Sequence, residues 1–133
     1  MNLEHGVQVF AIIHLGTSGL SHILAPRAWA RFFLLLRSKG DAGVFVVAFM
    51  SLGFGSIVAA LHPVWSGIPL VLTLLGWAQV LKALIYFSFP QFGLRKLQFV
   101  SLERAWMFIY AGAGLLALTG LFTYHLVSVG LAR

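Results

Sequence analysis

The sequence predicts an all-α, polytopic membrane protein: four transmembrane helices that form two parallel-repeat hairpins, with an amphipathic helix on the cytoplasmic side. Of its 133 residues, 60% are apolar and only 9% are charged, whereas about a quarter of a soluble domain is charged. Four windows of about 20 mostly apolar residues are long enough to cross a bilayer as helices. The basic residues gather in two loops between these windows. We therefore expect a single transmembrane domain over residues 1–133.

The expected spans are residues 6–25, 43–62, 68–89 and 105–127. Lys82 is the only Asp, Glu, Lys or Arg side chain inside them. Pro63 and Gly67 break the helix between the second and third spans. The first span could be read as a signal peptide, but Glu4 stands where such a signal carries basic residues, so we expect no cleavage.

Positive charge predicts the orientation of these spans. The first and third connections hold seven basic residues: Arg27, Arg31, Arg37, Lys39, Arg95, Lys96 and Arg104. Both tails and the second connection together hold one, Arg133. Because short cytoplasmic loops are enriched in Lys and Arg, we expect the basic loops in the cytoplasm and both termini on the outer side.

The two basic loops are alike, which predicts an internal duplication. Each begins at a proline, Pro26 or Pro90, and each ends in one acid, Asp41 or Glu103. We expect two copies of helix, interfacial segment and helix in the same orientation, related by an axis along the membrane normal.

The first basic loop has the pattern of an amphipathic helix near residues 27–38. Its apolar positions recur at helical spacing: Ala28, Trp29, Phe32, Phe33 and Leu36. Arg27 and Arg31 are turned away from them, toward the lipid headgroups. We therefore expect this helix to lie in the membrane interface.

The segment from Gly19 through Pro26 to Trp29, followed by a basic stretch and a glycine-rich span, resembles small bacterial inner-membrane proteins built as one two-helix hairpin. It is also similar to small four-span DoxX-like proteins. The resemblance implies a bacterial inner-membrane location. The hairpin group has no agreed biochemical activity, so the resemblance implies no functional site.

Polar residues form a stripe on the first span. They are His14, Thr17, Ser18, Ser21 and His22, at spacings that share one helix face. Such a stripe turns away from lipid, either as hydrogen-bonding contacts between helices or as the lining of a pocket. We expect it to be the principal contact surface, facing the third span, a second copy, a partner subunit or a small cofactor.

On the third span, Gln79, Lys82 and Tyr86 share a face. Lys82 could bind an anion or a lipid headgroup, or it could pair with Asp41 or Glu103. It could also extend to the membrane surface, which lies within reach of a lysine side chain.

Three histidines from different spans, His5, His62 and His125, are expected at the outer surface. Imidazole is a common ligand of Zn, Cu, Ni and haem iron, so a metal site there is one hypothesis. No two of these histidines have the spacing that places both on one helix face.

Small residues predict where helices approach each other closely. One ridge on the second span comprises Ser51, Gly55 and Ala59, and one on the fourth comprises Ala113, Ala117 and Gly120. Either ridge can pack within the bundle or against another chain.

The sequence favours a non-enzymatic protein, because the chain has no cysteine and its three acids all lie outside the spans. We expect an accessory or structural subunit of a larger membrane complex, or a homo-oligomer. The alternatives are a transporter or channel that acts as an oligomer, and a metal, haem or quinone binding protein in electron transfer. Lipids and other membrane subunits are the expected partners, and nucleic acid is not.

Overall fold

The computed structural model describes residues 1–133, and all of its regular structure is helical. The helices are α1 (Leu3–Leu24), α2 (Pro26–Ser38), α3 (Asp41–Leu61), α4 (Pro69–Ser88), α5 (Pro90–Leu97) and α6 (Trp106–Leu131). Four of them, α1, α3, α4 and α6, are long and apolar enough to cross a membrane. These four helices confirm the all-α fold and the number of expected spans.

The helix boundaries follow from local chemistry. The Asn2 side chain accepts a hydrogen bond from the His5 backbone N–H at 2.8 Å, so α1 begins earlier than residue 6, where we expected it. Helices α2, α4 and α5 each begin with proline, whose missing N–H has no partner to lose in the first turn. The turns before α3 and α4 contain Gly40 and Gly67 at φ 60° and 65°, a backbone conformation that favours glycine.

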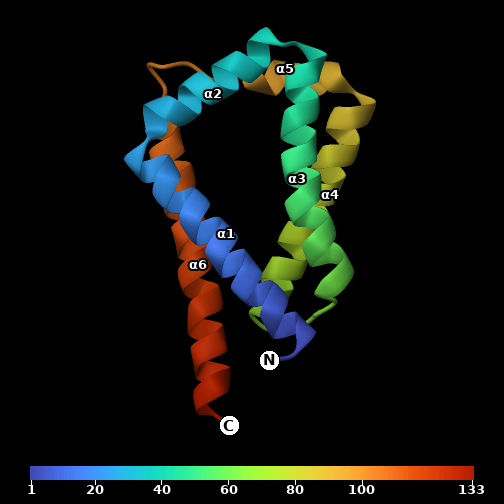
Figure 1. The fold of residues 1–133 in the computed structure, drawn as a ribbon, viewed down its shortest axis with the longest axis vertical. Helices are drawn as coiled ribbons and strands as arrows, with labels where there is room; N and C mark the ends of the chain where they lie inside the picture. The colour runs from blue at the N-terminus through green and yellow to red at the C-terminus, as the bar shows by residue number, and fades with distance from the viewer.

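The spanning helices form two pairs (Figure 1). Helix α1 packs chiefly on α6, and α3 packs chiefly on α4. Helix α1 crosses α6 obliquely, so that its N-terminal end reaches the α3–α4 pair. Helices α2 and α5 lie across the end of the molecule opposite both chain termini. Both basic loops therefore lie at the same end of the fold.

The apolar core has two parts. One cluster joins α1, α3, α4 and α6 toward the termini: Val7, Ala11, Leu15, Phe54, Val58, Leu72 and Phe122. The other lies under α2 and α5: Leu36, Val44, Val47, Ala48, Tyr86 and Leu97. Polar side chains of α1 and α4 line the space between the two clusters.

Helix α2 covers the segment 27–38 in which a helix was expected, and its place in the membrane interface stays a prediction. Arg27 and Arg31 are exposed, while Leu36 is buried and Phe32 and Phe33 pack against the second cluster. The apolar side of α2 therefore rests largely on the protein.

Glycines lie at the crossing point of each helix pair. A Cβ on Gly55 of α3 would lie 2.8 Å from the carbonyl oxygen of Gly76 on α4. Ser51 is buried on the same face, and the Ala59 backbone N would lie 3.2 Å from a Cβ on Gly76. The small ridge expected on the second span therefore packs within the bundle.

The ridge expected on the fourth span does not pack within the chain. Ala113 and Ala117 are exposed, and a Cβ on Gly120 would have no atom within 4 Å. Gly112, one residue from the expected face, makes the close contact with α1 instead. Packing of this ridge against another chain, the alternative that the sequence left open, stays a prediction.

A polar cavity between the helix pairs

A cavity of about 270 Å³ lies between the two helix pairs, where the two apolar clusters leave space. All four spanning helices and α2 contribute to its wall. The polar side chains that line it are His14, Ser18, His22, Ser51, Gln79 and Lys82. The stripe of the first span and the polar face of the third span therefore meet across one space.

The stripe divides into two sets. His14, Ser18 and His22 follow one another at intervals of four residues and line the cavity. Thr17 is exposed on the surface of the bundle, and Ser21 turns toward α2. Only three of the five stripe residues therefore line the cavity, because the five side chains spread around more of the helix than one cavity covers.

His22 is held in place by two contacts. Its Nδ1 lies 2.6 Å from the Ser18 carbonyl oxygen, which can only accept, so Nδ1 carries the proton and Nε2 is the free nitrogen of the neutral ring. The Trp29 ring stacks on it with centroids 4.1 Å apart. Trp29 Nε1 in turn donates to Ser21 Oγ at 2.9 Å. These contacts fasten α2 to α1 at the cavity wall.

His14, eight residues before His22 on α1, is exposed, and its ring lies against aromatic rings. Its ring centroid is 4.9 Å from that of Phe54 and 5.7 Å from that of Phe10. His14 and Phe54 therefore give this part of the cavity both an imidazole and an apolar ring.

Lys82 is the only charged side chain in the cavity wall, and no carboxylate accompanies it there. Its ammonium lies 5.5 Å from the centroid of the Tyr86 ring, a cation–π contact. Gln79, one turn earlier on α4, lines the same space. The arrangement offers a cation and a neutral amide to a guest molecule.

Tyr86 itself does not line the cavity. It is buried in the second apolar cluster, where its ring packs beneath Gly93 of α5. Of the three residues expected to share a face on α4, Gln79 and Lys82 line the cavity, and Tyr86 contacts the Lys82 ammonium from outside it.

A second polar group lies near the chain termini and is closed to solvent. Gln8, His62 and Thr73 are all buried and come from α1, the end of α3 and α4. His62 Nε2 lies 3.0 Å from Gln8 Nε2, and His62 Nδ1 lies 3.0 Å from Thr73 Oγ1. This group ties the free end of α1 to the α3–α4 pair.

The protons in this group can be assigned from its acceptors. Thr73 Oγ1 lies 2.7 Å from the Val64 carbonyl oxygen and 2.9 Å from that of His62, so the hydroxyl donates to a carbonyl. His62 Nδ1–H then donates to Thr73 Oγ1, and the Gln8 amide donates to His62 Nε2. Gln8 Oε1 is left buried without a partner. Burial lowers the pKa of His62, and Glu4 opposes that effect only in part.

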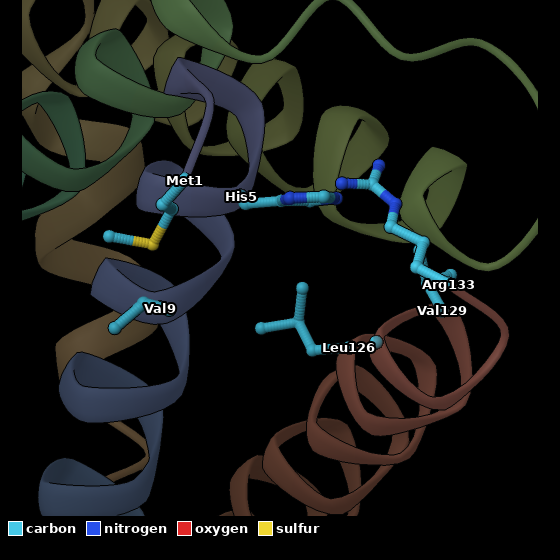
Figure 2. A pocket seen from close by; sticks show the side chains of 7 residues that line it. Met1, His5, Val9, Leu126, Val129 and Arg133 are labelled. Atoms are coloured by element: carbon cyan, nitrogen blue, oxygen red, sulfur yellow. The ribbon is translucent and has the colours of Figure 1, made fainter.

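The structure does not assemble His5, His62 and His125 into a metal site. No group of three or more His, Asp or Glu side chains is placed to hold a metal ion. Both ring nitrogens of His62 are engaged by Gln8 and Thr73. His5 lines a separate pocket of about 200 Å³ between the ends of α1 and α6, where Figure 2 shows Arg133 pointing toward it. An arginine at this position disfavours a cation.

Sequence reasoning missed Gln8 and Thr73. Each is a single polar residue in an apolar run, without the helical periodicity that made the stripe visible. The only available signal was the cost of placing an unpaired amide or hydroxyl within a spanning helix.

Comparisons with family models, with curated proteins and with solved structures found no match to this chain.

Proposed function

We propose that this chain is a non-enzymatic integral membrane protein that binds a small amphipathic molecule between its two helix pairs. One observation carries the proposal: Lys82 and Gln79 of α4 face His14, Ser18 and His22 of α1 across a cavity. A ligand that fills this space touches both helix pairs. Binding therefore also governs how firmly the two pairs are held together.

The chemistry of the cavity wall favours binding over catalysis. It offers hydroxyls, an amide, imidazoles and one ammonium, but His22 bonds to the backbone carbonyl of Ser18 and not to its hydroxyl, and no carboxylate lines the cavity to orient an imidazole as a base. Polar groups within a spanning segment are costly to keep unless they have a partner. A bound molecule with polar atoms at one end supplies that partner.

Native mass spectrometry of the protein, purified in mild detergent, tests this function. We expect an adduct of constant mass on the wild-type chain, released into organic solvent. Gln79→Leu, in the cavity wall, should lose the adduct. Thr17→Ala, on the exposed side of α1, is the matched control and should keep it. A wild-type chain that carries no adduct in any mild detergent would refute the function.

We also propose the finer architecture that the loops suggest. The chain lies in a bacterial inner membrane with both termini outside, which the basic loops at one end of the fold support. If the two halves of the chain, α1–α3 and α4–α6, are exchanged, α1 takes the place of α4 and α6 takes the place of α3. The α1–α6 pair then corresponds to the α4–α3 pair, which supports parallel repeats.

A second function, as a subunit of a homo-oligomer or a larger complex, is favoured by the outer face of α6. In the most apolar stretch of this helix only 6% of the residues are buried. Its exposed face carries Ala113, Ala117 and Gly120. Because the chain has no cysteine, Ala117→Cys gives a clean test: a disulfide-linked dimer in membranes supports self-association through α6. Its absence, with unchanged co-purification of other subunits in Ala117→Leu, argues against any contact there.

A further inference from the structure

Building on the proposed ligand-binding function, we infer that the ligand is a single-chain carboxylate lipid of the fatty-acid class. Its carboxylate lies at Lys82 and Gln79 in the cavity, and its acyl chain leaves past Trp29 and Met50 into an apolar groove beside α2.

The charge of the headgroup follows from Lys82. This ammonium lies within a spanning helix, half-buried, in a cavity wall that has no acid. The Tyr86 ring at 5.5 Å compensates only part of the cost of burying it. A carboxylate supplies the missing counter-charge, and Gln79 and the Ser18 hydroxyl supply neutral donors for its second oxygen. A neutral headgroup leaves the cation uncompensated.

The acyl chain follows from a second space that adjoins the cavity. A groove of about 330 Å³ is lined by Ser21, Ala25, Ala28, Trp29, Phe32 and Met50. Trp29 and Met50 line both spaces, so the groove adjoins the cavity at these two side chains. The groove is almost entirely apolar, and the one hydroxyl in it, that of Ser21, already accepts a hydrogen bond from Trp29. A cavity that holds one cation, beside one apolar groove, suits a molecule with one charged end and one chain.

Binding of radiolabelled palmitate to the purified full-length chain tests this inference, with 1-hexadecanol as the neutral competitor of equal chain length. We expect saturable palmitate binding and competition by 1-hexadecanol at least about tenfold weaker than by unlabelled palmitate. Lys82→Met should weaken palmitate binding by about tenfold or more, and Lys82→Arg should restore most of it.

Lys96→Met is the matched control. Lys96 lies 5.3 Å from the Phe92 ring centroid, a contact like that of Lys82 with Tyr86, but it is exposed and outside the cavity. We expect no change in palmitate affinity. Because Lys82→Met removes a charge from a span, it should insert and melt at least as well as the wild type, so weaker binding is not a sign of misfolding.

Palmitate with a photoreactive group near its methyl end tests the path of the chain. We expect cross-links in the segment from Ala25 to Phe32 and at Met50. Competition by 1-hexadecanol equal to that by palmitate, or unchanged binding in Lys82→Met, overturns the carboxylate inference. If the native adduct is still lost in Gln79→Leu, the proposed function stands without it. If no adduct exists at all, both are refuted.

Discussion

Gly19 and Gly112 meet backbone to backbone where α1 crosses α6. A Cβ built on Gly19 would lie 2.9 Å from the Gly112 carbonyl oxygen, and one on Gly112 would lie 2.6 Å from the Gly19 carbonyl oxygen. No side chain fits at either position without moving a helix. In a membrane, where close backbone approach replaces the hydrophobic effect between helices, this crossing holds the α1–α6 pair together.

Gly112→Leu should separate α1 from α6. Overpacking of this kind costs about 1–3 kcal/mol, which lowers the melting temperature by about 4 °C for each kcal/mol in a chain of this length. Gly114→Leu, on the same helix, is the control, because a Cβ there would have no atom within 4 Å. Equal melting of the two variants in detergent would show that the crossing is unimportant.

The α3–α4 pair can be tested in the same way, independently of the first. Gly55→Leu should destabilise the protein by about 1–3 kcal/mol, because a Cβ at residue 55 would lie 2.8 Å from the Gly76 carbonyl oxygen. Gly53→Leu places the same side chain where no atom lies within 4 Å. Thermal melting compares them, and a larger loss in Gly53→Leu would contradict the observed packing.

Acid should loosen the Gln8–His62–Thr73 group. Burial lowers the pKa of His62 in the folded protein below its ordinary value of about 6.5. At a pH between the folded-state pKa and this ordinary value, the unfolded chain binds more protons than the folded one. Stability is therefore complete above about pH 6.5 and falls as the pH is lowered toward the folded-state pKa. We expect a melting temperature lower at pH 5 than at pH 7.5. In His62→Gln this pH dependence should weaken, whereas His5→Gln should retain it.

The hydrogen bond from Trp29 to Ser21 should be worth about 1 kcal/mol. Ser21→Ala leaves the indole N–H of Trp29 without its partner at 2.9 Å, so the melting temperature should fall slightly. Thr17→Ala, one turn earlier and exposed, should melt like the wild type. The reverse order would mean that Thr17, and not Ser21, makes the important contact.

The orientation is open to labelling because the chain has no cysteine. Ser66→Cys, in the short connection between α3 and α4, should react with a membrane-impermeant maleimide in intact cells. Ser38→Cys, at the end of α2, should react only after permeabilisation. The opposite pattern would reverse the proposed topology.

The spans and the helix at residues 26–38 could be predicted because hydropathy and periodicity are properties of one segment at a time. The partners of each helix could not. Ala111, Gly112, Ala113, Gly114, Ala117 and Gly120 follow one another on α6 and occupy most of its faces. Composition therefore could not indicate that Gly112 meets α1 while Ala113 and Ala117 face outward.

The sequence predicted the two polar helix faces that line the cavity, but not that they meet. The stripe on α1 and the polar face of α4 were each recognisable, since residues three or four apart share a helix face. Their meeting depends on how α1 crosses α6 and leans toward α4, which no local pattern encodes. The same tilt brings Gln8 to His62 and Thr73, and so this contact between three separate segments stayed hidden.

The α1–α6 pair can form only late in the synthesis of the chain. Gly19 and Gly112 are separated by 93 positions, so α1 must enter the bilayer well before the ribosome has delivered the helix on which it packs. The α3–α4 hairpin, joined by a short turn, can close as soon as both helices are inserted. Until α6 arrives, α1 is held to this hairpin by the contact of Gln8 with His62 and by the packing of Phe10 and His14 against Phe54. A nascent chain arrested before Trp106 would lack Leu115, the residue through which α6 lines the cavity, so His14, Ser18 and His22 would lie beside a space that is open on that side.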